Sequence, residues 1–428
     1  MRIELIAPAI PGASQATKKA LVPPLGIAMV AALTPPDIEV SITDENVTPI
    51  DFQKQLDLVG ITTLTVTAPR AYQIADTFRV RGVSVILGGI HSSILPQEAA
   101  RHADSLIIGE AEGVWSRVIE DFKADRLHKE YRAAERPSLV GLPVPRRDLF
   151  AKNAYYVRNT VSATRGCPFA CSFCSVTLYF GRTYRCRPAE EVVNEVETLK
   201  DRGIVFFVDD NIVGNPRFAK ELFGRLIPCR LRWVGQASVT IAKDDELLRL
   251  AAASGCIGLL IGFETLSQAN LEKMNKKLNV AAEYDSIIRK IHSHGIGIHG
   301  CFILGLDGDD ESVFKDTVRF ARKMRLESAG FPYPTPLPGT ALYESLEKDG
   351  RLLTDEWARY NSEIVFEPKL MSRDSLERGH AWASREFFSL PSIWARIGLR
   401  RRNLVLLWAI NLIWRRHFRK NSGQVAPL

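Results

Sequence analysis

Short apolar runs rich in β-branched residues alternate with helical patterns along residues 1–130 of this 428-residue chain. The expected strands are residues 3–7, 38–43, 58–65, 83–87 and 105–108. Helical patterns lie between them, as at residues 70–80 and 96–100. Strands that alternate with helices form a parallel sheet with helices on both faces. The alternation therefore predicts a doubly wound, Rossmann-like α/β domain.

A second series of the same kind begins near residue 159, after a Pro- and Arg-rich stretch that predicts a linker over residues 133–158. Its expected strands are residues 160–164, 205–208, 232–234, 257–261, 297–304 and 328–331. Six such units predict a partial (β/α)6 barrel with functional residues at the carboxyl ends of the strands. We expect a first domain over residues 1–132, a barrel over 159–340 and a helical C-terminal segment over 341–428.

The net charge of +7 is concentrated at the C-terminus. The chain has no acidic residue from Pro391 onward, and its basic residues there are Arg396, Arg400, Arg401, Arg402, Arg415, Arg416, Arg419 and Lys420. The excess is local, so the composition does not indicate a nucleic-acid-binding protein.

The chain has seven cysteines, and four of them are scattered through apolar or strand-like contexts. These four are Cys186, Cys229, Cys256 and Cys301. Such spacing does not suggest a disulfide framework. The amino-terminal residues also lack the charged and long apolar regions of a signal peptide. We therefore expect a reducing, cytoplasmic location.

The other three cysteines form the motif Cys167-x-x-x-Cys171-x-x-Cys174, directly after the first expected barrel strand. Iron–sulfur cubanes are held by cysteine thiolates, ordinarily four, so three would leave one iron open to a small molecule. Structural zinc usually needs four ligands, often as two CxxC pairs, and no second pair is present. Nothing in the setting of Cys186 favours it as a fourth ligand, and a redox CxxC motif would not need Cys167. The motif predicts a [4Fe-4S] cluster.

The cysteine motif, with Phe173 before its last cysteine, resembles the signature of radical S-adenosylmethionine (SAM) enzymes. The resemblance implies that the open iron binds the amino and carboxylate groups of SAM, with Phe173 near the adenine. One electron from an external donor of the flavodoxin or ferredoxin type then cleaves the sulfonium to a 5′-deoxyadenosyl radical. In such enzymes the cofactor carries the difficult chemistry, while the protein supplies placement and excludes water.

Polar residues follow several of the expected barrel strands, where an active site would lie. The resemblance implies SAM contacts from these residues, which are Asp209, Asp210, Asn211, Gln236, Ser238 and Glu264. The first three are expected to bind the methionyl ammonium. Asp and Asn are also good helix N-caps, so one of the three could serve as a cap instead.

The first domain resembles the cobalamin-binding domain that precedes the barrel in one branch of these enzymes. The resemblance implies cobalamin contacts from Thr62, Thr63, Thr65, Gly88, Gly89, His91, Gly109, Glu110 and Glu112. No Asp-x-His-x-x-Gly motif is present, so that motif places no histidine as a lower ligand of cobalt. We expect His91 to pack against the corrin or a phosphate instead.

Both resemblances together imply a cobalamin-dependent radical SAM enzyme with a [4Fe-4S] cluster, SAM and cobalamin as cofactors. They favour methyl transfer from methylcobalamin to an unactivated carbon of a small-molecule or lipid/isoprenoid substrate. Cyclisation or rearrangement within the same branch, and a non-catalytic cobalamin or cluster sensor, are the alternatives. The sequence identifies no catalytic acid or base.

Residues 404–413 form an almost wholly apolar run between arginines. The run is too short to cross a bilayer, which needs about 20 residues. Tryptophans and basic flanks suit a helix that lies on an anionic membrane surface, so a peripheral membrane contact is one expectation. The alternative is a terminal helix that packs on the barrel with an arginine-rich outer face.

Overall fold

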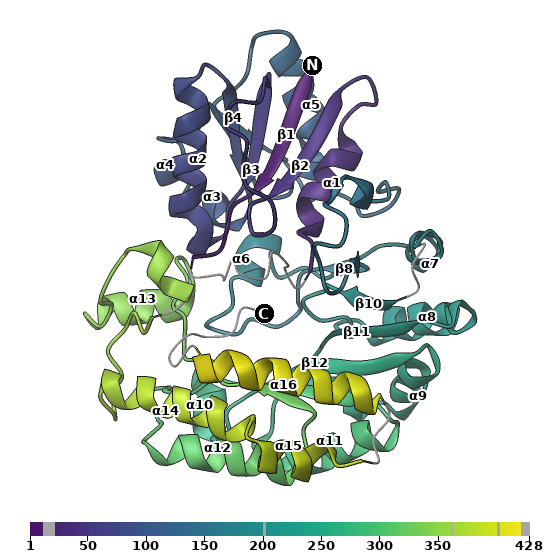
Figure 1. Ribbon diagram of the computed structural model, residues 1–428, viewed down its shortest axis with the longest axis vertical. Helices are drawn as coiled ribbons and strands as arrows, with labels where there is room; N and C mark the ends of the chain where they lie inside the picture. The colour runs from purple at the N-terminus through teal and green to yellow at the C-terminus, as the bar shows by residue number, and fades with distance from the viewer. Residues whose placement is uncertain (12–21, 200–202, 362, 400–402, 421–428) are drawn as a thin grey trace. The chain divides into compact units, whose positions relative to one another are not determined.

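The computed structural model describes residues 1–11, 22–199, 203–361, 363–399 and 403–420 (Figure 1). The chain divides into two compact units. Unit 1 comprises Met1–Val161 together with the short segments Leu178–Gly181 and Glu356–Tyr360, and unit 2 comprises the rest. The domain boundaries expected from the sequence stay a prediction.

Unit 1 is built on a six-stranded parallel sheet with the order β2-β1-β3-β4-β5-β6. Its strands are β1 (Arg2–Ala7), β2 (Glu39–Asp44), β3 (Leu58–Thr62), β4 (Ser84–Gly88), β5 (Ser105–Ile108) and β6 (Glu130–Arg132). Its helices are α1 (Leu25–Leu33), α2 (Ala68–Val80), α3 (Ile90–Ile94), α4 (Pro96–Ala99) and α5 (Trp115–Lys123). The strand order reverses direction beside β1, as in doubly wound folds that bind ligands beyond the carboxyl ends of their strands.

Two separate apolar cores hold helices against the sheet of unit 1. Phe78 of α2 packs with Val59 and Val85 in one core. Trp115 of α5 packs with Leu5 in the other. Buried clusters that share the strands but use different helices place helices on both faces, which confirms the doubly wound arrangement.

Unit 1 differs from the sequence prediction at two places. The strand predicted over residues 58–65 ends at Thr62, and Thr65–Thr67 forms a turn of 3-10 helix (η2). Strand β6 was not predicted, because a single buried residue between two charged ones carries no strand periodicity. The predicted linker packs on unit 1: Arg146 donates its backbone N–H to Ala28 O (3.0 Å), and the Tyr155 hydroxyl donates to Asp44 Oδ2 (3.0 Å).

The second sheet has the order β14-β13-β12-β11-β10-β7, and all of its strands except the edge strand β7 lie in unit 2. Its strands are β7 (Asn159–Val161), β10 (Ile204–Phe207), β11 (Arg232–Ala237), β12 (Cys256–Glu264), β13 (Gly297–Phe302) and β14 (Ser328–Gly330). The helices between and after them are α7 (Ala189–Glu197), α8 (Pro216–Leu226), α9 (Asp245–Ala253), α10 (Gln268–Lys273), α11 (Tyr284–Ser293) and α12 (Ser312–Lys323). A parallel sheet whose neighbours follow chain order is an open part of a (β/α) barrel, as predicted.

The C-terminal segment is helical, as expected. It contains α13 (Ala341–Lys348), α14 (Arg373–Phe387), α15 (Leu390–Ile397) and α16 (Leu404–Lys420). Helix α14 packs on α12, and α16 packs on α14 and α15. Among the described residues, no helix has both the length and the apolar character needed to span a membrane.

Candidate active site

The three cysteines of the motif lie in a loop between the two strands of a small hairpin. Strand β8 (Thr164–Arg165) pairs antiparallel with β9 (Arg185–Cys186), and the loop runs between them. Backbone bonds anchor the loop on both sides: Ser172 N–H donates to Met274 O (3.0 Å), and Leu342 N–H donates to Ser172 O (2.9 Å). The Asn275 amide also donates to Ala170 O (2.7 Å). The loop is therefore held by residues that follow α10 and by the start of α13.

The thiols of Cys167, Cys171 and Cys174 are half-buried and form no disulfide. Burial raises the pKa of each thiol, to about 11 for Cys174. Within the described part of the chain, no three His, Cys, Asp or Glu side chains converge closely enough to hold one metal ion. A cubane cluster does not need three side chains that converge on one ion, because each thiolate binds a separate iron. Three free thiols on one anchored loop fit that group, and iron binding would displace their protons.

Asp209, directly after β10, is a buried anchor for the strand that leads into the cysteine loop. Its carboxylate accepts the backbone N–H groups of Ala163 (3.1 Å) and Thr164, and the Thr164 hydroxyl (2.5 Å). Burial raises the pKa of Asp209 to about 6, while the bonds from Thr164 and Ala163 oppose the rise. These contacts give Asp209 a positioning role, and its contact with SAM stays a prediction.

An Asp209→Ala variant should be markedly less stable than the unmodified chain. It leaves two buried N–H groups and a hydroxyl without their acceptor, and each such group costs about 1–3 kcal/mol. We expect the free energy of unfolding, measured by chemical denaturation, to fall by at least about 3 kcal/mol. Asp210→Asn is the matched control, since the Asp210 carboxylate interacts only with the backbone N–H groups of Gly166 and of Asp210 itself, which an amide oxygen can still accept. Equal stability of the two variants would contradict the anchoring role.

Asn211, Gln236 and Ser238 tie the ends of β10 and β11 together beside the loop. Asn211 Oδ1 accepts the backbone N–H of Ser238 (3.1 Å), and Ile212 N–H donates to Gln236 O (2.9 Å). Burial raises the pKa of Cys167, and the Asn211 amide beside that thiol opposes the rise. The structure thus brings Asn211 to the first cysteine, and Ser238 to Asn211.

Glu264 forms a buried ion pair with Lys276, a residue that the sequence analysis did not identify. Lys276 Nζ lies 2.7 Å from Glu264 Oε1 and 5.9 Å from the centroid of the Phe173 ring. Burial alone would lower the pKa of Lys276, but the charges of Glu264 and Cys171 outweigh it and raise the pKa. The charged ammonium of Lys276 therefore lies beside the cysteine loop. No sequence pattern marks Lys276, because it reaches Glu264 only after α10 has turned the chain back.

The backbone at Glu264 is held in an unusual conformation. Glu264 has φ +66°, in the left-handed region that non-glycine residues rarely adopt. A Cβ at Gly262 would lie 2.2 Å from Glu264 Oε1, so the glycine leaves room for this carboxylate. The Asn279 amide donates to Gly262 O (3.0 Å), and the Tyr284 hydroxyl donates to Phe263 O (2.6 Å). A strained backbone conformation that several surrounding hydrogen bonds hold in place is typical of functional sites.

The predicted cobalamin contacts of unit 1 lie at the carboxyl ends of β3, β4 and β5. Thr62 and Gly88 end β3 and β4, and Thr63 and Gly89 follow them. The Thr63 hydroxyl donates to Gly88 O (2.9 Å), and Gly89 has φ +105°. A Cβ at Gly89 would lie 2.7 Å from Thr63 O, so two backbones pass each other where only glycine fits.

His91 is fully buried inside unit 1. Its Nδ1 lies 3.3 Å from Thr65 Oγ1, its Nε2 lies 3.2 Å from Glu98 Oε1, and its ring meets Trp357 edge-on. Burial lowers the pKa of His91, although Glu98 opposes the change. Both ring nitrogens thus have partners from within the unit, and a contact with cobalamin stays a prediction.

The loop after β5 carries the remaining predicted contacts. Gly109 has φ +84°, and apart from Gly109 and its two chain neighbours no described residue has an atom within 4 Å of the position that a Cβ would take. Glu110 is buried with Oε2 3.9 Å from Arg136 Nη1, and Glu112 lies in the 3-10 turn Ala111–Gly113. Backbone that carries no side chain and borders open space allows a large flat group to approach closely. The loop therefore fits cobalamin.

We expect Gly89→Ala to damage unit 1 more than Gly109→Ala. Both positions have positive φ, which costs an L-residue about 1–2 kcal/mol. Only at Gly89 would the new methyl group also overlap backbone atoms, those of Thr63. Thermal denaturation of the apoproteins would show the difference, with the lower melting temperature in Gly89→Ala. Equal melting temperatures of the two variants would contradict the close approach of the Gly89 and Thr63 backbones as the reason for the glycine.

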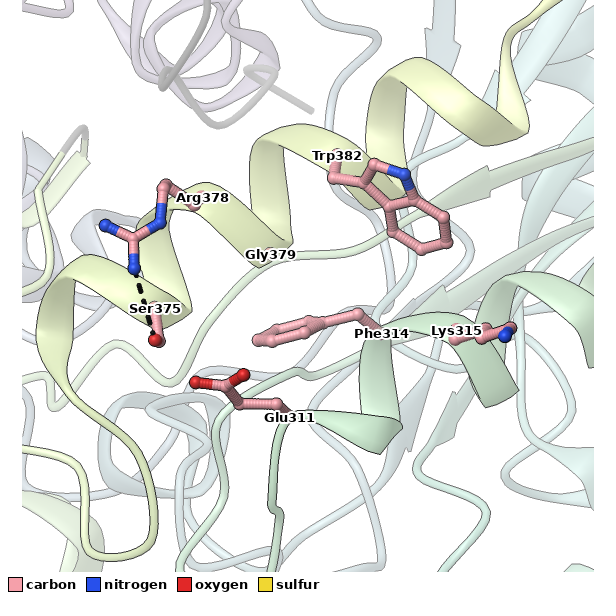
Figure 2. A pocket seen from close by; sticks show the side chains of 7 residues that line it. All are labelled: Glu311, Phe314, Lys315, Ser375, Arg378, Gly379 and Trp382. Carbon is pink, nitrogen blue, oxygen red and sulfur yellow. Dashed lines mark hydrogen bonds between the residues drawn. The ribbon is translucent and has the colours of Figure 1, made fainter.

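A separate hollow of about 330 Å³ lies on unit 2 between α12 and α14 (Figure 2). Phe314 and Trp382 form its apolar walls, and Glu311, Lys315 and Arg378 lie at its edge. None of the predicted site residues lines it. We do not assign this hollow to the cofactor site.

Comparisons with known families agree with the two units. The family described as the radical SAM superfamily matches residues 161–321, and the B12 binding domain matches residues 15–119. These matches define a class of enzyme with a cobalamin-binding domain in front of a radical SAM barrel.

Individual relatives show which members of this class the chain resembles. The bacteriochlorophyllide d C-12(1)-methyltransferase of Chlorobaculum tepidum is 32% identical over 94% of this chain and 90% of its own length. The anaerobic magnesium-protoporphyrin IX monomethyl ester cyclase of Cereibacter sphaeroides is 28% identical over 82% of this chain and 63% of its own length. This chain belongs to the family of cobalamin-dependent radical SAM enzymes, with a [4Fe-4S] cluster, SAM and cobalamin as cofactors.

The fold agrees as well. The structure of the radical SAM methyltransferase TsrM from Kitasatospora setae, which has cobalamin and a [4Fe-4S] cluster bound, matches with a TM-score of 0.72. The match covers 98% of this chain and 99% of TsrM, at 15% sequence identity. Nearly the whole chain therefore shares its fold with TsrM.

Proposed function

We propose that this chain is a C-methyltransferase that acts on an unactivated carbon of a tetrapyrrole. The observation that carries the proposal is the similarity to a methyltransferase named for a bacteriochlorophyllide, at 32% identity over 94% of this chain. The charges gathered at the cysteine loop support the SAM site that this reaction needs. Burial and the charge of Asp210 raise the pKa of Cys167, whereas Asn211 and Lys276 lower it. All three side chains therefore lie close enough to act on the thiol. A cation and an anion placed around an open iron complement the carboxylate and ammonium of an amino acid.

In this proposal, unit 2 holds the cluster and SAM. Cys167, Cys171 and Cys174 bind the cluster, Lys276 pairs with the methionyl carboxylate, and Asp210 accepts from the ammonium. Phe173 covers the adenine, and Asp209 keeps the loop in place. When bound, the cluster and SAM supply a 5′-deoxyadenosyl radical, and cobalamin supplies the methyl group.

Unit 1 holds cobalamin in this proposal through backbone rather than through a histidine ligand. The bare backbone at Gly109, beside open space, permits close approach of the corrin. Both nitrogens of His91 already have partners, which supports a cobalt whose lower face lacks a ligand from this histidine.

The substrate class is supported by the relatives. The methyltransferase is named for a bacteriochlorophyllide and the cyclase for magnesium-protoporphyrin, and both molecules are tetrapyrroles. The cyclase makes oxidative cyclisation of the same substrate class the second candidate. A lipid or isoprenoid substrate stays the third.

The proposal is tested by anaerobic reconstitution with iron, sulfide, cobalamin, SAM and a chlorin or porphyrin substrate, with reduced flavodoxin as electron donor. We expect 5′-deoxyadenosine and a product that is one methylene group heavier, both measured by mass spectrometry. A product without added methyl mass would favour cyclisation. A full cluster that forms no 5′-deoxyadenosine with any substrate would overturn the proposal.

A further inference from the structure

Helices α15 and α16 expose an apolar face to solvent, unlike the neighbouring helices of unit 2. The exposed residues of α16 lie on one side of the helix and are Val405, Ala409, Leu412, Ile413, Arg416 and Arg419. The exposed residues of α15 are Leu390, Pro391, Trp394 and Ala395. The exposed residues of α12, in contrast, are Ser312, Lys315, Asp316, Arg319 and Lys323. Solvent-facing sides of helices are normally polar, so α15 and α16 depart from the rule.

The apolar sides of the two helices meet at a pair of tryptophans. The rings of Trp394 on α15 and Trp408 on α16 lie 6.1 Å apart, and α16 runs beside α15 (Figure 1). Val405 is 84% exposed, Ile413 59% and Trp394 55%. We call Leu390, Trp394, Leu399, Val405, Leu412 and Ile413 the C-terminal apolar face. Large contiguous patches of this kind mark sites of interaction.

Positive charge adjoins the C-terminal apolar face. Arg416 and Arg419 are exposed on the same side of α16 as Leu412, one and two turns further along. The chain has no acidic residue after Glu386 to neutralise them. Apolar side chains with tryptophan beside exposed arginines complement the acyl boundary and the anionic headgroups of a bilayer.

A buried arginine keeps this face turned outward. Arg396 of α15 is 1% exposed, and its guanidinium donates to Leu326 O (2.7 Å), Glu327 O (3.1 Å) and Asn411 Oδ1 (2.9 Å). These bonds tie α15 and α16 to the chain beside β14. Rotation that buried the apolar face would break them, which is costly for a buried charge.

We propose that the C-terminal apolar face binds the surface of a bilayer that contains anionic phospholipid. Helix α16 has 17 residues and lies along the surface rather than across it. The proposal does not depend on the methyltransferase function, because its evidence lies wholly in α15 and α16.

The test is co-sedimentation of the holoenzyme with vesicles of phosphatidylglycerol and phosphatidylcholine, compared with phosphatidylcholine alone. We expect binding to the anionic vesicles that weakens at high salt. Leu412→Asp/Ile413→Asp should weaken binding at least about tenfold. Ser286→Asp/Ser312→Asp adds the same charge at exposed sites on α11 and α12, and it should bind like the unmodified enzyme.

A second variant keeps the test decisive if the apolar substitutions disturb folding, which circular dichroism would reveal. Arg416→Glu/Arg419→Glu changes only exposed charges and should lower binding to anionic vesicles at least about tenfold. Absence of vesicle binding by the unmodified enzyme would overturn the proposal. So would a dimer that Leu412→Asp/Ile413→Asp dissociates, in place of vesicle binding. Failure of methyl transfer would leave these binding results unaffected.

Discussion

Replacement of Cys171 by alanine is expected to abolish the [4Fe-4S] cluster and, with it, all SAM cleavage. Cys171 is the central cysteine of the loop, and no other cysteine of the motif can take its place. Loss of a residue that hydrogen-bonds a metal ligand already lowers metal affinity or activity about 10–100-fold, and loss of the ligand itself lowers them further. Iron and sulfide analysis, visible absorption and 5′-deoxyadenosine formation would measure the effect after anaerobic reconstitution.

Cys186→Ala is the matched control for this experiment. Cys186 is also half-buried and lies in β9, where it pairs with Thr164 at the base of the same loop. It should keep the full cluster and its activity. If Cys186→Ala also loses the cluster, the site has four cysteine ligands and no open iron. A cluster that persists in Cys171→Ala would refute the assignment of the motif.

Replacement of Lys276 by methionine is expected to destabilise unit 2 and to prevent SAM binding. The substitution leaves the Glu264 carboxylate buried without its cation, and breaking a buried pair costs about 3–5 kcal/mol. It also removes the ammonium that we assign to the methionyl carboxylate. Chemical denaturation of the apoprotein and SAM binding to the reconstituted enzyme would measure the two effects separately.

The double variant Glu264→Gln/Lys276→Met separates a structural role from a binding role. Without the buried negative charge, most of the lost stability should return, because replacing both partners of a buried pair is often nearly neutral. SAM affinity should stay low. If the double variant binds SAM as tightly as the unmodified enzyme, Lys276 only neutralises Glu264, and its assigned role in SAM binding is wrong.

Most strands were predictable because their apolar runs are continuous. β4 and β5 lie in the middle of a parallel sheet, and most of their residues are buried on both faces, so the run itself indicates the strand. β6 and the hairpin of β8 and β9 were not predicted. Strands of two or three residues have too few side chains to show a period, and only their pairing partners define them.

The candidate site was predictable to a similar extent. The cysteine motif is local, so its spacing alone indicates a cluster. Lys276 could not be found, because its contact with Glu264 depends on where α10 returns the chain. The anchoring role of Asp209 was missed for the same reason, since its partners are Thr164 of β8 and the preceding Ala163, far from Asp209 in sequence.

The sequence by itself determined the two strand–helix series, the three cysteines on one loop and the family that this pattern indicates. These features are encoded over short stretches of chain, where side-chain type and spacing are sufficient. The tertiary structure alone decided which charges surround the cysteines, why Gly89 must be glycine, and which side of α16 faces solvent. Each of these depends on contacts between segments far apart in sequence, and such contacts exist only once the chain has folded.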